Sequence, residues 1–96
     1  MELHELVEIV DDQNSFLAFV EKLRIDREDA VRQTKYNPRA SYSSDANGWE
    51  NATIESFLGA AHAWAMDSDF GESQGLSGEN LWKKMAVFLY CGKIYE

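Results

Sequence analysis

Basic side chains are scarce in this sequence, and none occurs between Arg39 and Lys83. The 96 residues include 9 Lys and Arg against 17 Asp and Glu, which gives a formal net charge of −8. Proteins that bind phosphate backbones need basic residues to displace counterions. The composition therefore argues against nucleic-acid binding, and the surplus of acids raises the question of a basic partner.

Cysteine and long apolar runs are scarce as well. A single Cys cannot form an internal disulfide bond, and no apolar run approaches the ~20 residues that span a bilayer. Residues 1–12 lack the basic segment and the small-residue cleavage site of a secretory signal peptide. We expect a cytoplasmic protein that does not bind membranes.

Apolar residues recur at helical spacing through most of the chain. A first helix is indicated by Leu3, Leu6, Val7 and Val10, and a second by Phe16, Phe19, Val20 and Leu23. The mostly charged stretch 26–35 is expected to continue the second helix. Asn37-Pro38 should stop it, because the residue before a proline avoids the α region.

The stretch 52–66 is the most apolar helix candidate. A helix that is apolar or small nearly all round is typical of a buried element, and Glu55 is the only formal charge in this one. Its stripe consists of Ile54, Phe57, Leu58, Ala61, Trp64 and Ala65. A last helix follows, and we expect Gly92 to end it as a left-handed C′ glycine. The sequence therefore predicts a single all-α domain over residues 1–96, a compact bundle of four to five helices around a buried central helix at about 52–66.

The base-free stretch 40–82 has two explanations. It can be a buried helix with an acidic loop on either side, or an acidic face that attracts a basic partner. The expected loops are 37–50, which contains the strong turn signal Asn47-Gly48, and 67–78.

Few side chains could carry chemistry. His62 has no second His or Cys at metal-ligand spacing, and segment 67–78 departs from the calcium-loop pattern at three positions. Cys91 lies near a helix C-terminus, where the dipole disfavours a thiolate. We expect no catalytic residue, no metal site and no cofactor. The alternative is a small-molecule-binding protein or enzyme that uses Glu55, His62 and Cys91 in a pocket beside the central helix.

Trp49 stands in the long loop just before the central helix and has two interpretations. Its ring can pack back on that helix and close the loop, which is a structural role. It can also be an exposed aromatic anchor for a protein partner, the type of side chain that dominates interface energy.

Two blocks carry a resemblance to a known family. They are Trp49-Glu50-Asn51, which opens the run to Ala60, and the C-terminal Gly92-Lys93-Ile94-Tyr95-Glu96. With these blocks, almost the full chain resembles a family of small, acidic, uncharacterised bacterial proteins that is known only as a domain of unknown function. The resemblance implies a stand-alone bacterial cytoplasmic domain, and it brings no catalytic residues.

The most direct hypothesis is a non-enzymatic protein-interaction module with an acidic face. A specific version is an immunity-type inhibitor that covers the basic surface of a toxin or nuclease, since complementary charge speeds association. A third hypothesis is an oligomer formed through Val87 and Tyr90. The predicted partner-binding residues are Tyr42, Asp45, Trp49 and Glu50, followed by Asp67, Asp69 and Glu72.

Overall fold

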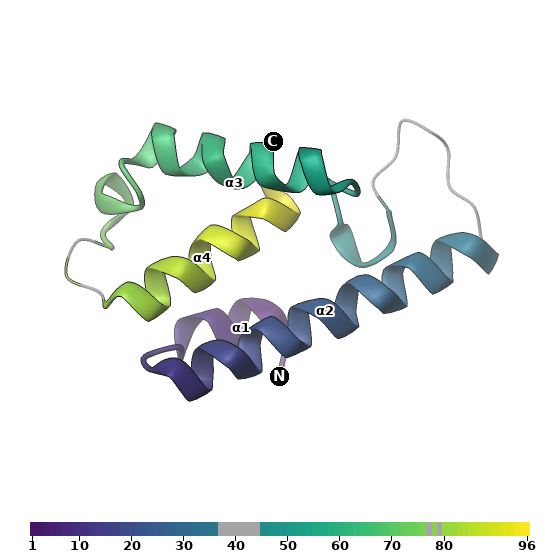
Figure 1. Ribbon diagram of the computed structural model, residues 1–96, viewed down its shortest axis with the longest axis horizontal. Coiled ribbons are helices and arrows are strands. Elements are labelled where there is room, and N and C mark those ends of the chain that lie inside the picture. Colours follow the sequence, from purple (N-terminus) through teal and green to yellow (C-terminus); the bar gives the residue numbers. More distant parts are fainter. Residues whose placement is uncertain (37–44, 77, 79) are drawn as a thin grey trace.

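The computed structural model describes residues 1–36, 45–76, 78 and 80–96. Over these residues there is no β-strand, and one isolated antiparallel bridge joins Asp45 and Trp49. The predicted all-α class with four helices is confirmed (Figure 1). Within the same residues, no helix is both long and apolar enough to cross a membrane. The elements are α1 (Leu3–Glu8), α2 (Gln13–Tyr36), the 3₁₀ turn η1 (Ala46–Gly48), α3 (Ile54–Ser68), the 3₁₀ turn η2 (Glu72–Gln74) and α4 (Leu81–Ile94).

Local capping explains where the two longest helices begin. The Asp12 carboxylate accepts the backbone N–H of Ser15 at 2.8 Å, and the Ser15 hydroxyl accepts the backbone N–H of Asp12 at 3.1 Å. Thr53 caps α3 through a similar reciprocal pair. α2 then runs unbroken to Tyr36, so the prediction that 26–35 continues the second helix is confirmed.

The main core lies between α1, α2 and α4. Val7, Phe19, Leu23 and Ala86 are buried there, and Phe19 is completely inaccessible. Trp49 belongs to the same cluster of buried residues, although it lies outside the helices. The segment before α3 is therefore part of the core.

α4, rather than α3, occupies the centre of the bundle. α4 packs against α1, α2 and α3, whereas α3 packs mainly against α4. The side of α3 that faces inward buries Ala60, Ala61 and Trp64, but Ile54 is 78% exposed and Leu58 is 55% exposed. The prediction of a buried central helix at 52–66 is therefore wrong. Burial needs neighbours on every side, and α4 covers only one side of α3.

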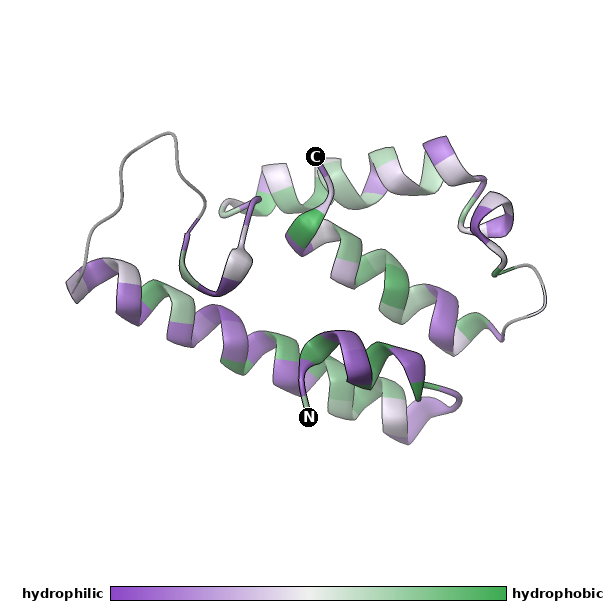
Figure 2. Cartoon of the chain, turned by 180° about the vertical axis from the view of Figure 1, so that it is seen from behind, coloured by the Kyte–Doolittle hydropathy of each residue, from purple (hydrophilic) through white to green (hydrophobic). Residues whose placement is uncertain are grey.

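The molecule is a thin slab, with extents of 42 × 27 × 18 Å. Packed helix axes lie about 8–10 Å apart and Cα atoms lie about 2.3 Å from each axis, so the shortest extent corresponds to about two layers of helices. The accessible surface of 6110 Å² exceeds the roughly 5,600 Å² that the mass predicts for a compact monomer. Seen from behind, α1 lies over α2, and α2 carries long hydrophilic stretches (Figure 2). Such a slab has two broad sides and little interior.

Gly92 does not end α4, which continues to Ile94. A Cβ atom at Gly92 would lie 2.7 Å from the ring of Phe57, so the glycine lets this ring approach the α4 backbone. The predicted C′ role is wrong because a glycine near a helix end looks the same in sequence whether it supplies a left-handed turn or room for a neighbour.

Candidate functional site

Trp49 lies in the core. The residue is 4% exposed, its ring stacks on Phe57 with 6.1 Å between centroids, and its Nε1 donates to Asp26 Oδ2 at 2.8 Å. The preceding turn has φ of +62° at Asn47 and +77° at Gly48, a left-handed pair that Asn-Gly adopts readily. Of the two interpretations of Trp49, packing that closes the loop is confirmed and the exposed anchor is wrong.

Two cations surround the Trp49 ring, and we call Asp26, Arg27, Trp49 and Lys93 the Trp49 cluster. Lys93 Nζ donates to Asp26 Oδ2 at 2.8 Å, the same oxygen that accepts from Trp49. The Arg27 guanidinium and the Lys93 ammonium lie 5.2 and 5.5 Å from the ring centroid, within cation–π range. The Lys93 side chain is only 9% exposed, so its charge depends on Asp26 for compensation. The polar atoms of the Trp49 cluster thus form hydrogen bonds and ion pairs with one another, an arrangement that stabilises the fold.

The two sequence blocks that carry the family resemblance meet beside this cluster. Asn51 Nδ2 donates to the carbonyl oxygens of Gly92 and Tyr95 at 3.1 and 2.9 Å. The backbone N–H of Glu50 donates to the carbonyl of Lys93 at 3.1 Å. The blocks therefore hold the segment before α3 against the end of α4.

Opposite charges that are separated in sequence are paired in space. Arg27, from the basic stretch of α2, forms an ion pair with Asp45 at 3.0 Å, and Lys84 of α4 lies 4.0 Å from Glu72. Two of the acids predicted to bind a partner are thus compensated within the chain. The acidic face is smaller than the count of acids suggests.

The other predicted partner-binding residues do not gather at one place. Asp67 accepts a hydrogen bond from the Tyr95 hydroxyl at 2.5 Å, and this bond raises the pKa of Tyr95. Asp69 is exposed at the left-handed C-cap of α3, while Glu50 is exposed beyond its opposite end. Tyr42 lies outside the described residues. The set is split between the two ends of a helix that is about 22 Å long.

Two hollows adjoin the Trp49 cluster. One of about 350 Å³ is apolar and is bounded by Arg27, Trp49, Asn51, Ala52, Thr53, Ile54, Phe57 and Leu58. The other, of about 400 Å³, is polar and lies beside α1, lined by residues 1–4 with Lys22, Asp26, Asn47, Tyr90 and Lys93. Both hollows are open to solvent.

The residues of the enzyme alternative line neither hollow. Glu55 and His62 are exposed on α3, whereas Cys91 is buried on α4, where burial raises the pKa of its thiol to about 11. Among the described residues, no group of three or more His, Cys, Asp or Glu is placed to hold a metal ion. Glu55, His62 and Cys91 therefore share neither of these two hollows.

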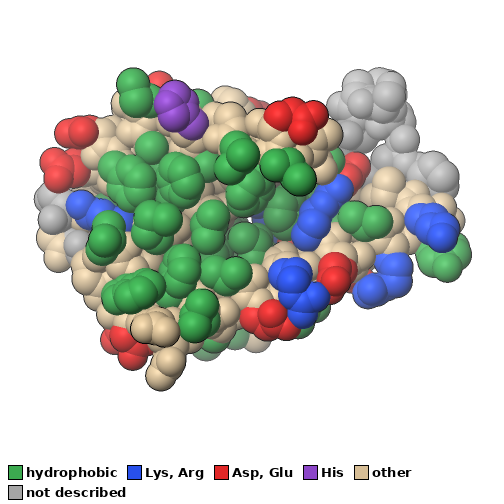
Figure 3. Space-filling model, viewed as in Figure 1, with side chains coloured by type: hydrophobic (Ala, Val, Ile, Leu, Met, Phe, Trp, Pro, Cys, Tyr) green, Lys and Arg blue, Asp and Glu red, His purple; other side chains and the backbone are tan. Residues whose placement is uncertain are grey.

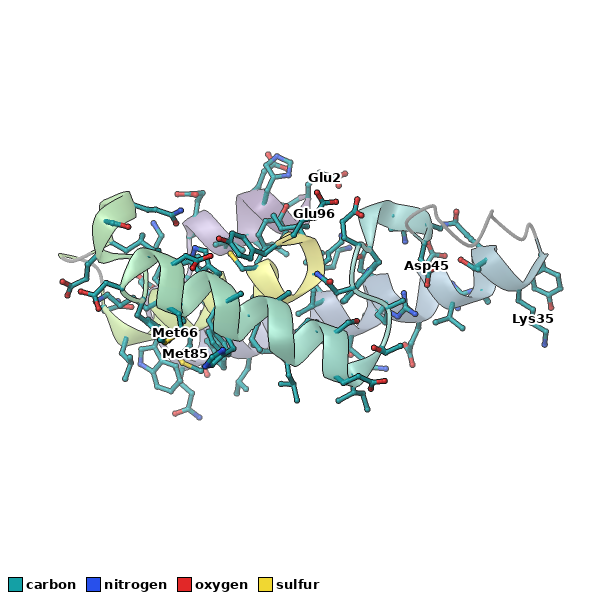
Figure 4. The ribbon with its side chains drawn as sticks, turned by 90° about the horizontal axis from the view of Figure 1, so that it is seen from above. Glu2, Lys35, Asp45, Met66, Met85 and Glu96 are labelled. Carbon is teal, nitrogen blue, oxygen red and sulfur yellow. The ribbon has the colours of Figure 1, made fainter. Side chains whose placement is uncertain are left out.

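A broad apolar surface covers the side of the slab opposite α1 (Figure 3). On α3, an exposed row recurs at every fourth residue: Ile54 (78% exposed), Leu58 (55%), His62 and Met66 (71%). Met85 of α4 points to the same side of the molecule as Met66 (Figure 4).

α4 and α2 extend the same surface. Trp82 lies one turn before Met85, is 40% exposed, and contacts Phe16 of α2 with 5.5 Å between ring centroids. We define the apolar face as the surface formed by Ile54, Leu58, Met66, Trp82, Met85 and Phe16.

Sequence reasoning missed the apolar face because it assigned the whole stripe of 52–66 to the core. The stripe from Ile54 to Ala65 is wider than one neighbouring helix covers. The width of this stripe was the one signal in the sequence that part of it stays exposed. One edge of the stripe packs on α4, and the other edge opens onto the apolar face.

Fold and surface together define a small all-α domain with one open apolar side. The sequence model of DUF7660, a family of unknown function, matches residues 12–96, and the chain belongs to that family. The predicted resemblance to a domain-of-unknown-function family is thus confirmed. The match includes α2, α3, α4, the Trp49 cluster and the whole apolar face, and it leaves out α1. Comparison with curated proteins and with solved structures gives no match.

Proposed function

We propose that this DUF7660 domain is a non-enzymatic protein-interaction module that binds another polypeptide through the apolar face. The observation that carries the proposal is the exposed row on α3, where Ile54, Leu58 and Met66 are 78%, 55% and 71% exposed. Fully burying a large apolar side chain contributes about 1.5–3 kcal/mol. These three residues together with Trp82 therefore offer about 4–7 kcal/mol before the cost of association.

The shape of the face suits a polypeptide better than a small molecule. Small-molecule sites are concave and bury most of their ligand, whereas the apolar hollow beside Leu58 is open on one side. Exposed Trp and Met side chains are typical of protein interfaces, because Trp supplies a large contact area and Met adapts its shape. Trp82, Met66 and Met85 are of these types.

A second candidate keeps the acidic surface as the binding site. Asp69 and Glu72 are exposed at one end of α3, where Lys84 lies 4.0 Å from Glu72 and compensates part of this charge. A basic partner would bind there with strong salt dependence. The immunity-type inhibitor of a toxin or nuclease is the specific form of this candidate.

Affinity capture from a lysate of the source organism separates the two candidates. The apolar-face proposal expects a partner that stays bound in high salt and is lost when Leu58 is replaced by Glu. The acidic candidate expects a partner that salt releases and that the double substitution D69N/E72Q abolishes. Capture of the same proteins by the Leu58→Glu variant as by the wild type would refute binding through the apolar face.

A further inference from the structure

We infer that the apolar face is the surface through which two copies of this chain pair as a symmetric homodimer. This inference rests on the proposed function, because it names the polypeptide that the face binds. It is carried by four observations on the described residues: the area of the face, the row on α3 that no other helix covers, the lack of charge on that row, and the mixed charges at the edge of the face.

The area of the face fits a second copy. The four exposed side chains of Ile54, Leu58, Met66 and Trp82 leave roughly 300 Å² of apolar surface open, which is already the scale of the largest patch on ordinary monomers. The face occupies a broad side of the slab, which measures 42 × 27 Å, and a standard interface needs about 800 Å² per partner. One such side is large enough to supply that area.

The packing of α3 points to the same occupant. α3 packs mainly against α4, and its exposed row of Ile54, Leu58 and Met66 has no covering layer among the described residues. A second copy placed face to face supplies that layer to both chains at once. Each α3 would then bury the apolar row that α4 leaves open.

The distribution of charge permits two acidic copies to meet here. Each chain has a net charge of −8, but α3 carries no Asp, Glu, Lys or Arg between Glu55 and Asp67. Like charges separated by more than the ~8 Å Debye length at physiological salt repel one another weakly. The copies can therefore approach through the uncharged row on α3.

The edge of the face carries both signs of charge. On α2, Phe16, Val20 and Arg24 follow one another at every fourth residue. Arg24 forms ion pairs with Glu21 and Glu28. In a symmetric interface, residue i of one copy meets residue j of the other, and j meets i. An edge that carries both Arg and Glu is complementary in charge to the same edge on a second copy. A basic partner would instead be complementary to an edge of acidic residues.

Sedimentation equilibrium of the full chain over a wide concentration range tests the inference. We expect the mass to rise reversibly from 11.0 kDa towards twice that value, and we expect high salt not to dissociate the dimer. Leu58→Glu should weaken the dimer at least about tenfold, since it places a charge in the buried centre of the interface. Ile9→Glu is the matched control, because Ile9 is also 55% exposed but lies at the end of α1, on the opposite side. Circular dichroism checks that both variants keep the wild-type helix content.

The outcomes separate this inference from the proposed function. If the wild-type protein stays monomeric at every concentration, the homodimer is overturned. If this monomer still captures a partner through Leu58, the proposed function remains valid. A dimer that both substitutions weaken equally, or that only Ile9→Glu weakens, assigns the contact to another surface and also overturns the inference. A monomer that captures no partner through Leu58 overturns both.

Discussion

Replacing Asp26 by Asn removes the charge that compensates Lys93 and keeps an acceptor for the Trp49 indole. Breaking a buried ion pair by removing one partner costs about 3–5 kcal/mol of unfolding free energy. The Asp26 side chain is 21% exposed and the hydrogen bond to Trp49 can persist, so we expect a loss of about 3 kcal/mol, at the lower end of that range. Lys93→Met should cost about 1–2 kcal/mol, because the remaining carboxylate is partly solvated and still accepts from Trp49.

A double-mutant cycle tests this reasoning directly. The double variant D26N/K93M holds no unpaired buried charge, so its loss should be smaller than the sum of the single losses by about 1–3 kcal/mol. Urea unfolding followed by circular dichroism supplies the free energies, provided that the m-values agree among the variants. Arg24→Gln is the control, because its ion pairs with Glu21 and Glu28 are more than half exposed and are worth about 0–1 kcal/mol. Additive losses, or an Asp26→Asn loss no larger than that of Arg24→Gln, would refute the role assigned to the Trp49 cluster.

Further predictions concern glycines, the thiol and acid sensitivity. Gly92→Ala should destabilise the protein by about 1–3 kcal/mol, because the new Cβ would lie 2.7 Å from an aromatic ring. Gly59→Ala should stabilise the protein by about 0.5–1 kcal/mol, because Gly59 is inside α3 and a Cβ atom there would meet no packing neighbour within 4 Å. Urea unfolding that finds Gly92→Ala more stable than Gly59→Ala would contradict both expectations. Iodoacetamide should alkylate Cys91 much more slowly in the native than in the urea-unfolded chain, because burial raises the pKa of the thiol to about 11, and equal rates would contradict this burial. The hydrogen bond from the Asn47 amide lowers the pKa of Asp29, so this carboxylate stabilises the fold above its ordinary pKa near 4 and loses that effect as the pH falls through its folded-state value. Asp29→Asn should therefore make unfolding free energy fall less steeply with decreasing pH in the acid range, and an unchanged slope would contradict the assignment.

Local signals predicted much of this fold from the sequence. The spacing of Phe16, Phe19 and Leu23 and the charged continuation of α2 depend on neighbours within two turns, so they could be recognised in the chain itself. The Asn47-Gly48 turn is of the same kind, because its left-handed φ values follow from the two residue types. These elements have the structure that was predicted.

Long-range partners could not be predicted in the same way. Asp26 and Lys93 are 67 positions apart, and nothing in the spacing of either residue indicates that they share Trp49. The apolar character of α3 indicated burial, but the amount of cover depends on how many helices the chain can place around it. The sequence predicted a candidate site at acids in the loops, whereas the structure indicates a face whose residues the sequence had assigned to the core.

The placement of the two blocks that carry the family resemblance has a consequence for experiments on function. Trp49 and Asn51 contact α2, α3 and the end of α4, so substitutions there disturb the fold itself. Surface residues such as Leu58 and Met66 are exposed and do not belong to the Trp49 cluster. Binding studies on this domain are best made with variants of the second kind.

The three tryptophans provide one measurement that tests the interaction face most directly. The indole N–H of Trp49 donates to Asp26 and that of Trp64 donates to Gln74, while Trp82 is 40% exposed on the apolar face. In ¹⁵N correlation spectra recorded as the protein is concentrated, the indole signal of Trp82 should shift, and that of the buried Trp64 should stay in place. A Trp82 signal that does not move, or movement confined to Trp64, would contradict docking at the apolar face.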